Sequence, residues 1–319
     1  MNSGRPEIKE GIKRQVRQRC GFGCVICGIP VYHYDHMDEY NVVQEHAEDN
    51  LTLLCGYHHD LKSRGQLPVQ VVRAKNTNPH NVTQNKTAMH SLFYYGEHAE
   101  IVAGGNRVIV SNRSVSAVKI DGDSIVDFEL VDGNLMLNLD FRDRDKAPVL
   151  TVRQNELVHS THLWDYEFTG KRLSIREKKG QIYLTVVFEA DKQRVVIEKG
   201  LVSHNGVDLL IDPRGLCILN NLISLSGNSI AGIDTAISIG DGSGSSGPVA
   251  MHFEIDRRTY DRGAAIASAR KRMAQAAKVP PGYSRGCPQF PVSLSAGRPA
   301  TWTSICFLPY PWERSSWGA

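Results

Sequence analysis

The first nineteen residues carry the hydrophobic period of a helix. Between residues 7 and 19 the apolar side chains Ile8, Ile12 and Val16 recur four positions apart, which places them on one face of an α-helix. The segment therefore predicts a short amphipathic helix. Its other positions supply the positive charge of the N-terminal region, from Lys13, Arg14, Arg17 and Arg19.

A different pattern begins near residue 99 and continues to residue 239. Short runs of alternating apolar and polar residues are separated by turn dipeptides, which predicts β-strands. In one pair, residues 125–130 and 135–141 flank Asp132-Gly133-Asn134, a sequence typical of a tight hairpin. The region is therefore predicted to be a mainly antiparallel all-β domain, either a sandwich or a solenoid. No fixed repeat period emerges, which favours the sandwich.

These patterns divide the chain into four regions. Residues 1–65 hold the helix and all motifs with metal-ligand spacing, and the polar residues 66–98 are interpreted as a connector. Residues 99–239 form the β domain. Residues 240–319 begin with a flexible linker rich in Gly and Ser, continue through an exposed basic helix at 261–278, and end in a tail expected to have little fixed structure.

Composition limits the location and the partners of the protein. A chain of 319 residues can bury two cores, and its net charge of +3 means that any nucleic-acid contact must come from a local patch. The N-terminus lacks the apolar segment of a signal peptide, and no apolar run reaches the ~18 residues of a membrane span. Seven cysteines, four of them in the first 55 residues, do not form a regular disulfide framework. We therefore expect a cytoplasmic protein with no membrane partner and with cysteines free to bind metal.

Two short motifs in the N-terminal region have the spacing of metal ligands. Cys24 and Cys27 are three positions apart, and so are Cys55 and His58 further along. Each pair lets one tight turn present two ligands to a single ion, and together they supply the four ligands of a closed tetrahedral zinc site. The alternative is a set of buried thiols in a small core. Because a unit this small needs a staple, we expect structural zinc (Zn²⁺) with no position left for substrate.

His59 indicates a second centre. It directly follows His58, and neighbours in a helix diverge by ~100° around the axis, so the two imidazoles should serve different sites. The partners available to His59 lie in the segment His33-Tyr34-Asp35-His36. A carboxylate and an imidazole suit a divalent ion such as Mg²⁺, Mn²⁺ or Ni²⁺ that keeps positions open for phosphate and water. We therefore expect a catalytic centre that contains Asp35, His36 and His59.

Together these motifs resemble the HNH family of nucleases, whose ββα-metal core joins two strands to a helix. The resemblance covers residues 12–65 and rests on Cys24-x-x-Cys27, Asp35-His36, Asn50, Cys55-x-x-His58-His59 and Lys62. It implies an α+β chain in which a small zinc-stapled ββα-metal domain precedes the β domain. One position departs from the pattern, because the family's zinc set is usually four Cys and His58 stands in the last place. Zinc tolerates this exchange.

The resemblance implies a role for each matching residue. His36 matches the general base that activates water, and Asn50 matches the Asn that fixes the loop orienting this base. Asp35 and His59 match the ligands of the catalytic ion, which stabilises charge on the phosphate and on the leaving 3′ oxygen. The implied activity is hydrolysis of phosphodiester bonds in DNA. A histidine with an ordinary pKa near ~6.5 suits the base role at neutral pH.

Two further residues are candidates for supporting roles. His33 is a candidate partner of the ligands or an alternative ligand. Lys62 lies three positions after His59, so it shares that helix face and is a candidate partner of the ligands or a candidate phosphate contact.

Targeting is expected to lie outside the N-terminal region. Residues 1–65 contain eight Lys and Arg against nine Asp and Glu, so their own affinity for DNA should be weak. The β domain or the basic segment 262–278 is expected to provide DNA targeting, a protein interface or homo-oligomer assembly. A further polar cluster near Trp164 fits no standard ligand set and is interpreted as surface residues: His159, His162, Asp165 and Glu167.

A rival hypothesis is a non-catalytic zinc-binding adaptor for nucleic acid or protein. In that case the Cys/His motifs are purely structural, and Asp35 and His59 are ordinary polar residues. The distance between these two side chains discriminates the hypotheses. A separation above ~8 Å favours the adaptor, because ligands of one ion lie ~2.0–2.5 Å from it.

Overall fold

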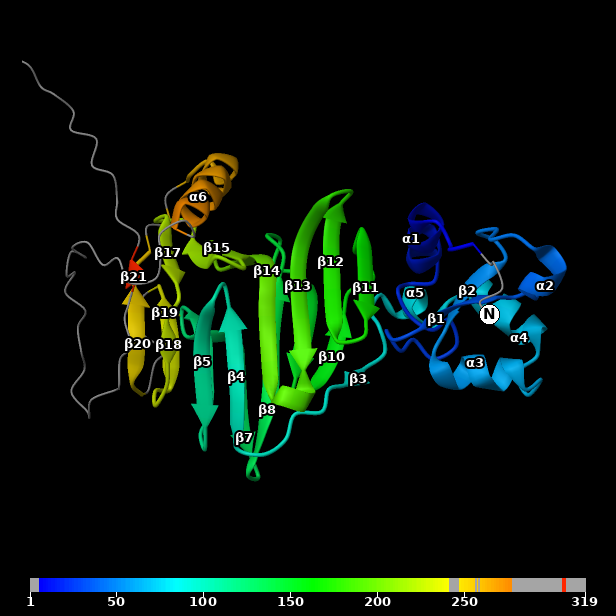
Figure 1. The fold of residues 1–319 in the computed structure, drawn as a ribbon, viewed down its shortest axis with the longest axis horizontal. Coiled ribbons are helices and arrows are strands. Elements are labelled where there is room, and N and C mark those ends of the chain that lie inside the picture. Colours follow the sequence, from blue (N-terminus) through cyan, green and yellow to red (C-terminus); the bar gives the residue numbers. More distant parts are fainter. Residues whose placement is uncertain (1–5, 241–246, 256, 258, 277–305, 308–319) are drawn as a thin grey trace, which may run out of the picture.

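The computed structural model describes residues 6–240, 247–255, 257, 259–276 and 306–307. This part of the chain is a mixed α+β structure in which strands predominate (Figure 1). A small helical unit with one short hairpin lies at one end, next to β11 (Asp165–Thr169), and two large sheets form the rest.

The N-terminal unit, defined here as residues 6–84, contains five helices and the hairpin. The helix predicted at 7–19 is α1 (Glu10–Arg19), whose Val16 is fully buried. The two strands pair antiparallel, with Asp35 opposite Thr52. The remaining elements are β1 (His33–His36), α2 (Tyr40–Val43), β2 (Leu51–Leu54), α3 (Gly56–Ser63), α4 (Val69–Thr77) and α5 (His80–Gln84).

Residues 66–98 are more ordered than the predicted connector. They contain α4 and α5, and Val72 of α4 is fully buried in the hydrophobic cluster of the N-terminal unit. The buried amide of Asn81 on α5 donates hydrogen bonds to the carbonyl oxygens of Gly21 and Gly28, both at 2.9 Å. Residues 66–84 are therefore packed despite their polar composition, because Val72 and the amide of Asn81 anchor them to the rest of the N-terminal unit.

The first sheet has eight strands among the described residues and is mainly antiparallel. Its strand order begins at β20 (Val249–Phe253) and continues with β19 (Thr235–Ile239), β6 (Val115–Ile120), β7 (Asp123–Val131), β8 (Asn134–Arg142), β9 (Pro148–Arg153), β10 (Glu156–His159) and β3 (His90–Ser91). The β7–β8 hairpin confirms the predicted turn. Asp132 and Gly133 both have positive φ, which matches a two-residue type I′ turn and its right-handed twist.

The second sheet has eleven described strands and branches at its longest one, β14 (Arg194–His204). Residues 194–197 of this strand pair in parallel with β4 (His98–Ala103), and residues 200–204 pair antiparallel with β15 (Val207–Asp212). The other members are β5 (Asn106–Ser111), β11, β12 (Arg172–Lys178), β13 (Gln181–Glu189), β16 (Gly215–Ile218), β17 (Ile223–Ser226), β18 (Ser229–Ile230) and β21 (Cys306–Phe307).

The two open sheets share one hydrophobic core, an arrangement expected of a sandwich. The core joins Val118 and Phe141 of the first sheet to Ile101, Ile197 and Leu209 of the second, each at most 4% exposed. Burial of these inward-facing side chains is the main force that holds the sheets together.

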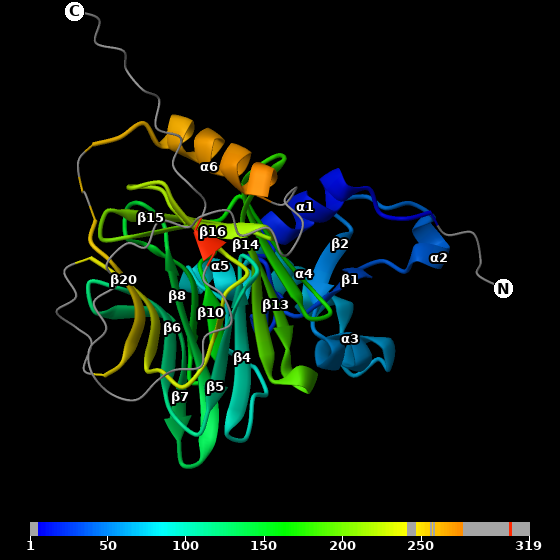
Figure 2. The same cartoon turned by 60° about the vertical axis from the view of Figure 1, so that its left-hand side comes forward.

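The basic helix predicted at 261–278 is present as α6 (Arg262–Ala276), but one of its faces is buried. Ala269 and Met273 pack on Leu210, Cys217 and Leu219 of the second sheet. Figure 2 shows α6 lying across β15 and β16. The helix is therefore part of the packed structure rather than fully exposed. Residues 241–246, which make up most of the linker predicted at 240–248, and most of the predicted tail lie outside the described residues.

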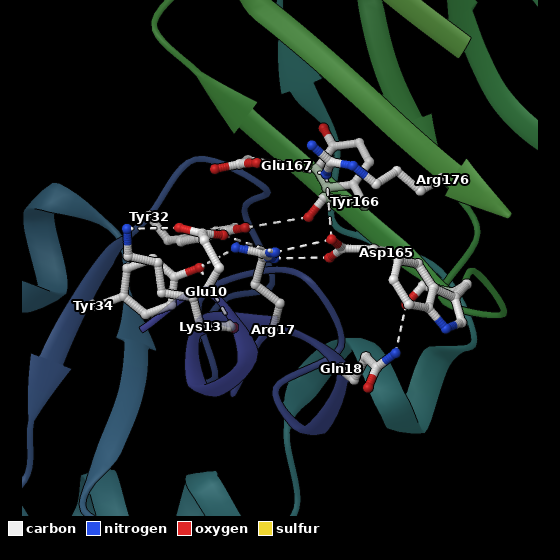
Figure 3. A network of polar contacts seen from close by, with 11 residues as sticks. Glu10, Lys13, Arg17, Gln18, Tyr32, Tyr34, Asp165, Tyr166, Glu167 and Arg176 are labelled. Atoms are coloured by element: carbon white, nitrogen blue, oxygen red, sulfur yellow. Dashed lines mark hydrogen bonds and ion pairs between the residues drawn. The ribbon is translucent and has the colours of Figure 1, made fainter. Parts of the chain in front are cut away.

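The N-terminal unit docks on the second sheet through a buried ion pair. Arg17 of α1 donates from Nε to Asp165 Oδ1 at 2.8 Å and from Nη2 to Asp165 Oδ2 at 2.9 Å, and both side chains are at most 3% exposed. Its Nη1 donates to the Tyr34 hydroxyl at 2.7 Å (Figure 3). Burial lowers the pKa of Arg17, but the hydrogen bonds that Arg17 donates to Asp165, together with the charge interactions with Asp165 and the neighbouring tyrosines, raise it on balance. Asp165 is therefore an interface residue, and its interpretation as a surface residue is wrong.

An aromatic cluster lies beside this ion pair. Phe22, 1% exposed, meets the rings of His159 and Tyr166 edge-on at 6.3 Å, and those two rings stack 3.5 Å apart. His159 is also buried, so its interpretation as a surface group is wrong as well.

His159 should make stability fall in acid. Burial lowers its pKa to about 3, against ~6.5 for an ordinary histidine. The unfolded chain therefore takes up a proton at His159 between these values while the folded chain does not. The contribution of His159 to the free energy of unfolding is fully present above pH ~6.5. It falls by up to ~1.4 kcal/mol for each pH unit below that value. Urea unfolding at pH 7 and pH 5 should show a drop about 2 kcal/mol larger in the wild type than in His159→Phe. Equal drops in the two proteins would contradict the assignment.

Candidate metal centre and neighbouring histidine site

Two tight turns bring four metal-ligand side chains together. Cys24 and Cys27 lie in the loop after α1, where the Gly28 nitrogen donates to the Cys24 carbonyl at 2.7 Å. Gly28 has a φ of +79°, and a Cβ there would lie 2.2 Å from Asn81 Oδ1, so only glycine fits. Cys55 is the N-cap of α3, and His58 lies in its first turn.

The ligand atoms have the spacing of a tetrahedral site. All four lie within 4.8 Å of one another. Cys27 Sγ is 3.8 Å from Cys55 Sγ, and His58 Nδ1 is 3.2 Å from Cys55 Sγ and 3.4 Å from Cys24 Sγ. Two sulfurs bound tetrahedrally at ~2.3 Å lie ~3.8 Å apart, so the set fits zinc. The predicted ligands Cys24, Cys27, Cys55 and His58 are thus within metal-ligand distance.

The thiol chemistry also favours a metal. A hydrogen bond from the Cys27 thiol lowers the pKa of Cys24 to about 4, and the same contact raises the pKa of Cys27. The pair therefore stabilises a thiolate, the form that binds metal. Cys20 lies outside this set. It is fully buried, its Sγ contacts Asn76 Oδ1 at 3.6 Å, and burial raises its pKa to about 11.

A second group of polar side chains lies where β1 meets α3. Asp35 Oδ1 is 3.5 Å from His59 Nε2, well inside the 8 Å criterion. Asp35 Oδ2 forms an ion pair with Lys62 Nζ at 2.8 Å, and the same ammonium donates to the His36 carbonyl at 2.6 Å. Lys62 thus contacts Asp35, a predicted ligand, and the β1 backbone, and its predicted contact with phosphate stays a prediction. The exposed His33 lies beside His59, with ring centroids 5.6 Å apart.

His36 belongs to a chain of imidazoles. Its side chain is 5% exposed, and its Nε2 lies 3.0 Å from His46 Nδ1. His46 Nε2 lies 2.7 Å from the Pro6 carbonyl oxygen. The ring of Tyr40 stacks on His46 with centroids 4.9 Å apart. Sequence reasoning singled out His36 but not His46, because nothing in the local spacing linked the two positions.

Asn50 closes the loop that carries His46. Its Oδ1 accepts from the Asp38 backbone nitrogen at 2.7 Å, and its Nδ2 donates to the Asp38 carbonyl at 3.0 Å. The amide thereby fastens the two ends of residues 38–50 across the β1–β2 hairpin. The predicted role of Asn50 in orienting a catalytic base stays a prediction.

The basic side chains of α1 are largely engaged within the protein. Arg17 binds Asp165, Lys13 pairs with Glu10 at 2.9 Å, and Arg19 donates to the Leu51 carbonyl. Arg14 lies over the Trp164 ring, 4.8 Å from its centroid. The predicted positive charge of this helix therefore serves mainly internal contacts.

Comparison with family models, with curated proteins and with solved structures finds no match to this chain. None of the helices in the described part of the chain is long and apolar enough to cross a membrane. Conclusions about activity therefore depend on the geometry of the two sites.

Proposed function

We propose that this chain is a metal-dependent endonuclease of the HNH type that hydrolyses phosphodiester bonds in DNA. One observation carries the proposal. A carboxylate and an imidazole, Asp35 and His59, lie 3.5 Å apart; Asp35 directly precedes the buried His36 in the chain, and His59 directly follows His58 of the zinc-type Cys/His cluster. A purely structural zinc site does not need the additional pair of Asp35 and His59.

The spacing of Asp35 and His59 is compatible with a shared divalent ion. Two ligand atoms bound at ~2.1 Å can be at most ~4.2 Å apart, and the observed separation of 3.5 Å lies inside that limit. Asp35 would bind such an ion through Oδ1, since Lys62 holds Oδ2. Mg²⁺ is the expected ion, with Mn²⁺ or Ni²⁺ as alternatives, and two protein ligands leave room for phosphate and water. When bound, the ion stabilises charge on the phosphate and on the leaving oxygen.

The protein groups divide the remaining work. His36 accepts a proton from the attacking water, a role suited to an imidazole near neutral pH. Asn50 keeps the 38–50 loop in place, and Lys62 holds both the Asp35 carboxylate and the carbonyl of His36. The β domain, with α6 packed on it, is proposed to serve targeting, protein binding or assembly.

A nicking assay tests the proposal. Wild type, His36→Ala and His98→Ala would be incubated with supercoiled plasmid in Mg²⁺, Mn²⁺ or Ni²⁺, with an EDTA control. The wild type should nick or linearise the plasmid, and His36→Ala should be at least 100-fold slower because it lacks the base. His98→Ala, at an exposed position on β4, should match the wild type.

Two outcomes would contradict the proposal. Undiminished cleavage by His36→Ala would remove the base assignment. Absence of cleavage with every ion, on plasmid and on single-stranded DNA, by protein that retains its zinc would favour the non-catalytic adaptor.

A further inference from the structure

The hydrogen-bond chain from Pro6 to His36 has only one consistent arrangement of protons when both imidazoles are neutral. The Pro6 carbonyl can only accept, so His46 carries its proton on Nε2 and donates it. His46 Nδ1 is then an acceptor, so His36 must donate from Nε2. A neutral His36 with its proton on Nε2 has its lone pair on Nδ1.

We propose that His46 is a positioning residue that fixes the tautomer and the ring orientation of His36, so that Nδ1 is the proton-accepting atom. This inference rests on the proposed nuclease function and assigns a role to a residue outside the HNH-type motif. Its basis is the geometry of two short contacts, 3.0 Å and 2.7 Å, that end on a backbone carbonyl.

The surroundings of His46 are built to hold it in place. Tyr40 stacks on its ring with an interplanar angle of 26° and meets the His36 ring edge-on at 5.3 Å. Asn50 clamps the loop that carries both Tyr40 and His46. Loop fixation by Asn50 is thereby transmitted to His36 through His46. Partners of this kind commonly change activity by about 10–100-fold when they are removed.

Nitrogen-15 NMR of the zinc-loaded protein tests the tautomer without any need for activity. At pH 8.5, where ordinary imidazoles are neutral, His36 and His46 should both show the Nε2–H pattern. In His46→Leu the His36 signal should move toward a mixture of tautomers, because the acceptor is gone. A wild-type His36 protonated on Nδ1, or a signal unaffected by His46→Leu, would overturn the proposal. This readout stands even if the plasmid is not the substrate.

Kinetics of three variants test the consequence for catalysis. His46→Leu should lower kcat about 10–100-fold with little change in KM, since substrate contacts remain. His46→Asn places Oδ1 near the position of Nδ1 and should restore most of kcat. His98→Leu, the same exchange at an exposed position, should have no effect. Equal losses in His46→Leu and His46→Asn, or a loss confined to KM, would overturn the positioning role.

Discussion

Removal of zinc is expected to unfold the N-terminal unit while both sheets stay folded. The hydrophobic cluster of this unit contains ten buried residues, and two of them, Cys24 and Cys55, belong to the candidate Cys/His metal site. So small a core cannot replace the apparent ~10–16 kcal/mol that structural zinc supplies in zinc-finger peptides. The core shared by the two sheets, in contrast, contains no member of the Cys/His set.

Hydrogen exchange measured by mass spectrometry would locate this unfolding. After chelation, or in Cys55→Ser, amides of β1, β2 and α3 should lose protection, whereas those of β7 and β8 should keep it. Metal analysis should find one zinc per wild-type chain and none in Cys55→Ser. The matched control is Cys20→Ser, a buried thiol of the same cluster outside the ligand set, which should retain zinc. Full zinc content and unchanged protection in Cys55→Ser would exclude the four-ligand site.

The spacing of the candidate metal ligands could be predicted from the sequence because each pair of ligands lies within one turn of the chain. Cys24 and Cys27 lie in one short loop, and Cys55 and His58 lie at the N-cap and first turn of one helix. The divergence of His58 and His59 around α3 also depends on local helix geometry alone. It agrees with the structure, in which His58 faces the thiols and His59 faces Asp35.

Contacts between residues far apart in the chain could not be predicted from the sequence. Arg17 and Asp165 are 148 residues apart, so α1 gave only the pattern of a basic amphipathic helix. The parallel pairing of β14 with β4 brings together strands about ninety residues apart, and alternation alone does not specify a partner. The link between His36 and His46 depends on how the 38–50 loop folds back. In each case the partner is determined by the tertiary fold, and the local sequence pattern does not distinguish it from other candidate partners.

Replacing Asp165 should destabilise the protein more than replacing Arg17, although both changes break the same ion pair. In Asp165→Asn the guanidinium of Arg17 stays buried, with the Tyr34 hydroxyl at 2.7 Å and Glu10 at 3.9 Å. In Arg17→Met the carboxylate of Asp165 keeps Arg176, 3.3 Å from Oδ2 and 30% exposed. A buried charge left without its partner costs about 3–5 kcal/mol, so Asp165→Asn should approach that range and Arg17→Met should stay below it.

Thermal unfolding would separate these effects. Asp165→Asn should lower the Tm by roughly 6 °C or more, taking about 2 °C for each kcal/mol. The double variant Arg17→Met/Asp165→Asn should melt above Asp165→Asn, because removing the stranded guanidinium relieves its desolvation. Arg14→Met applies the same exchange on the same helix to a residue that only stacks on Trp164, so it should cost under about 1 kcal/mol. Additive losses in the double variant would mean that the ion pair does not couple α1 to β11.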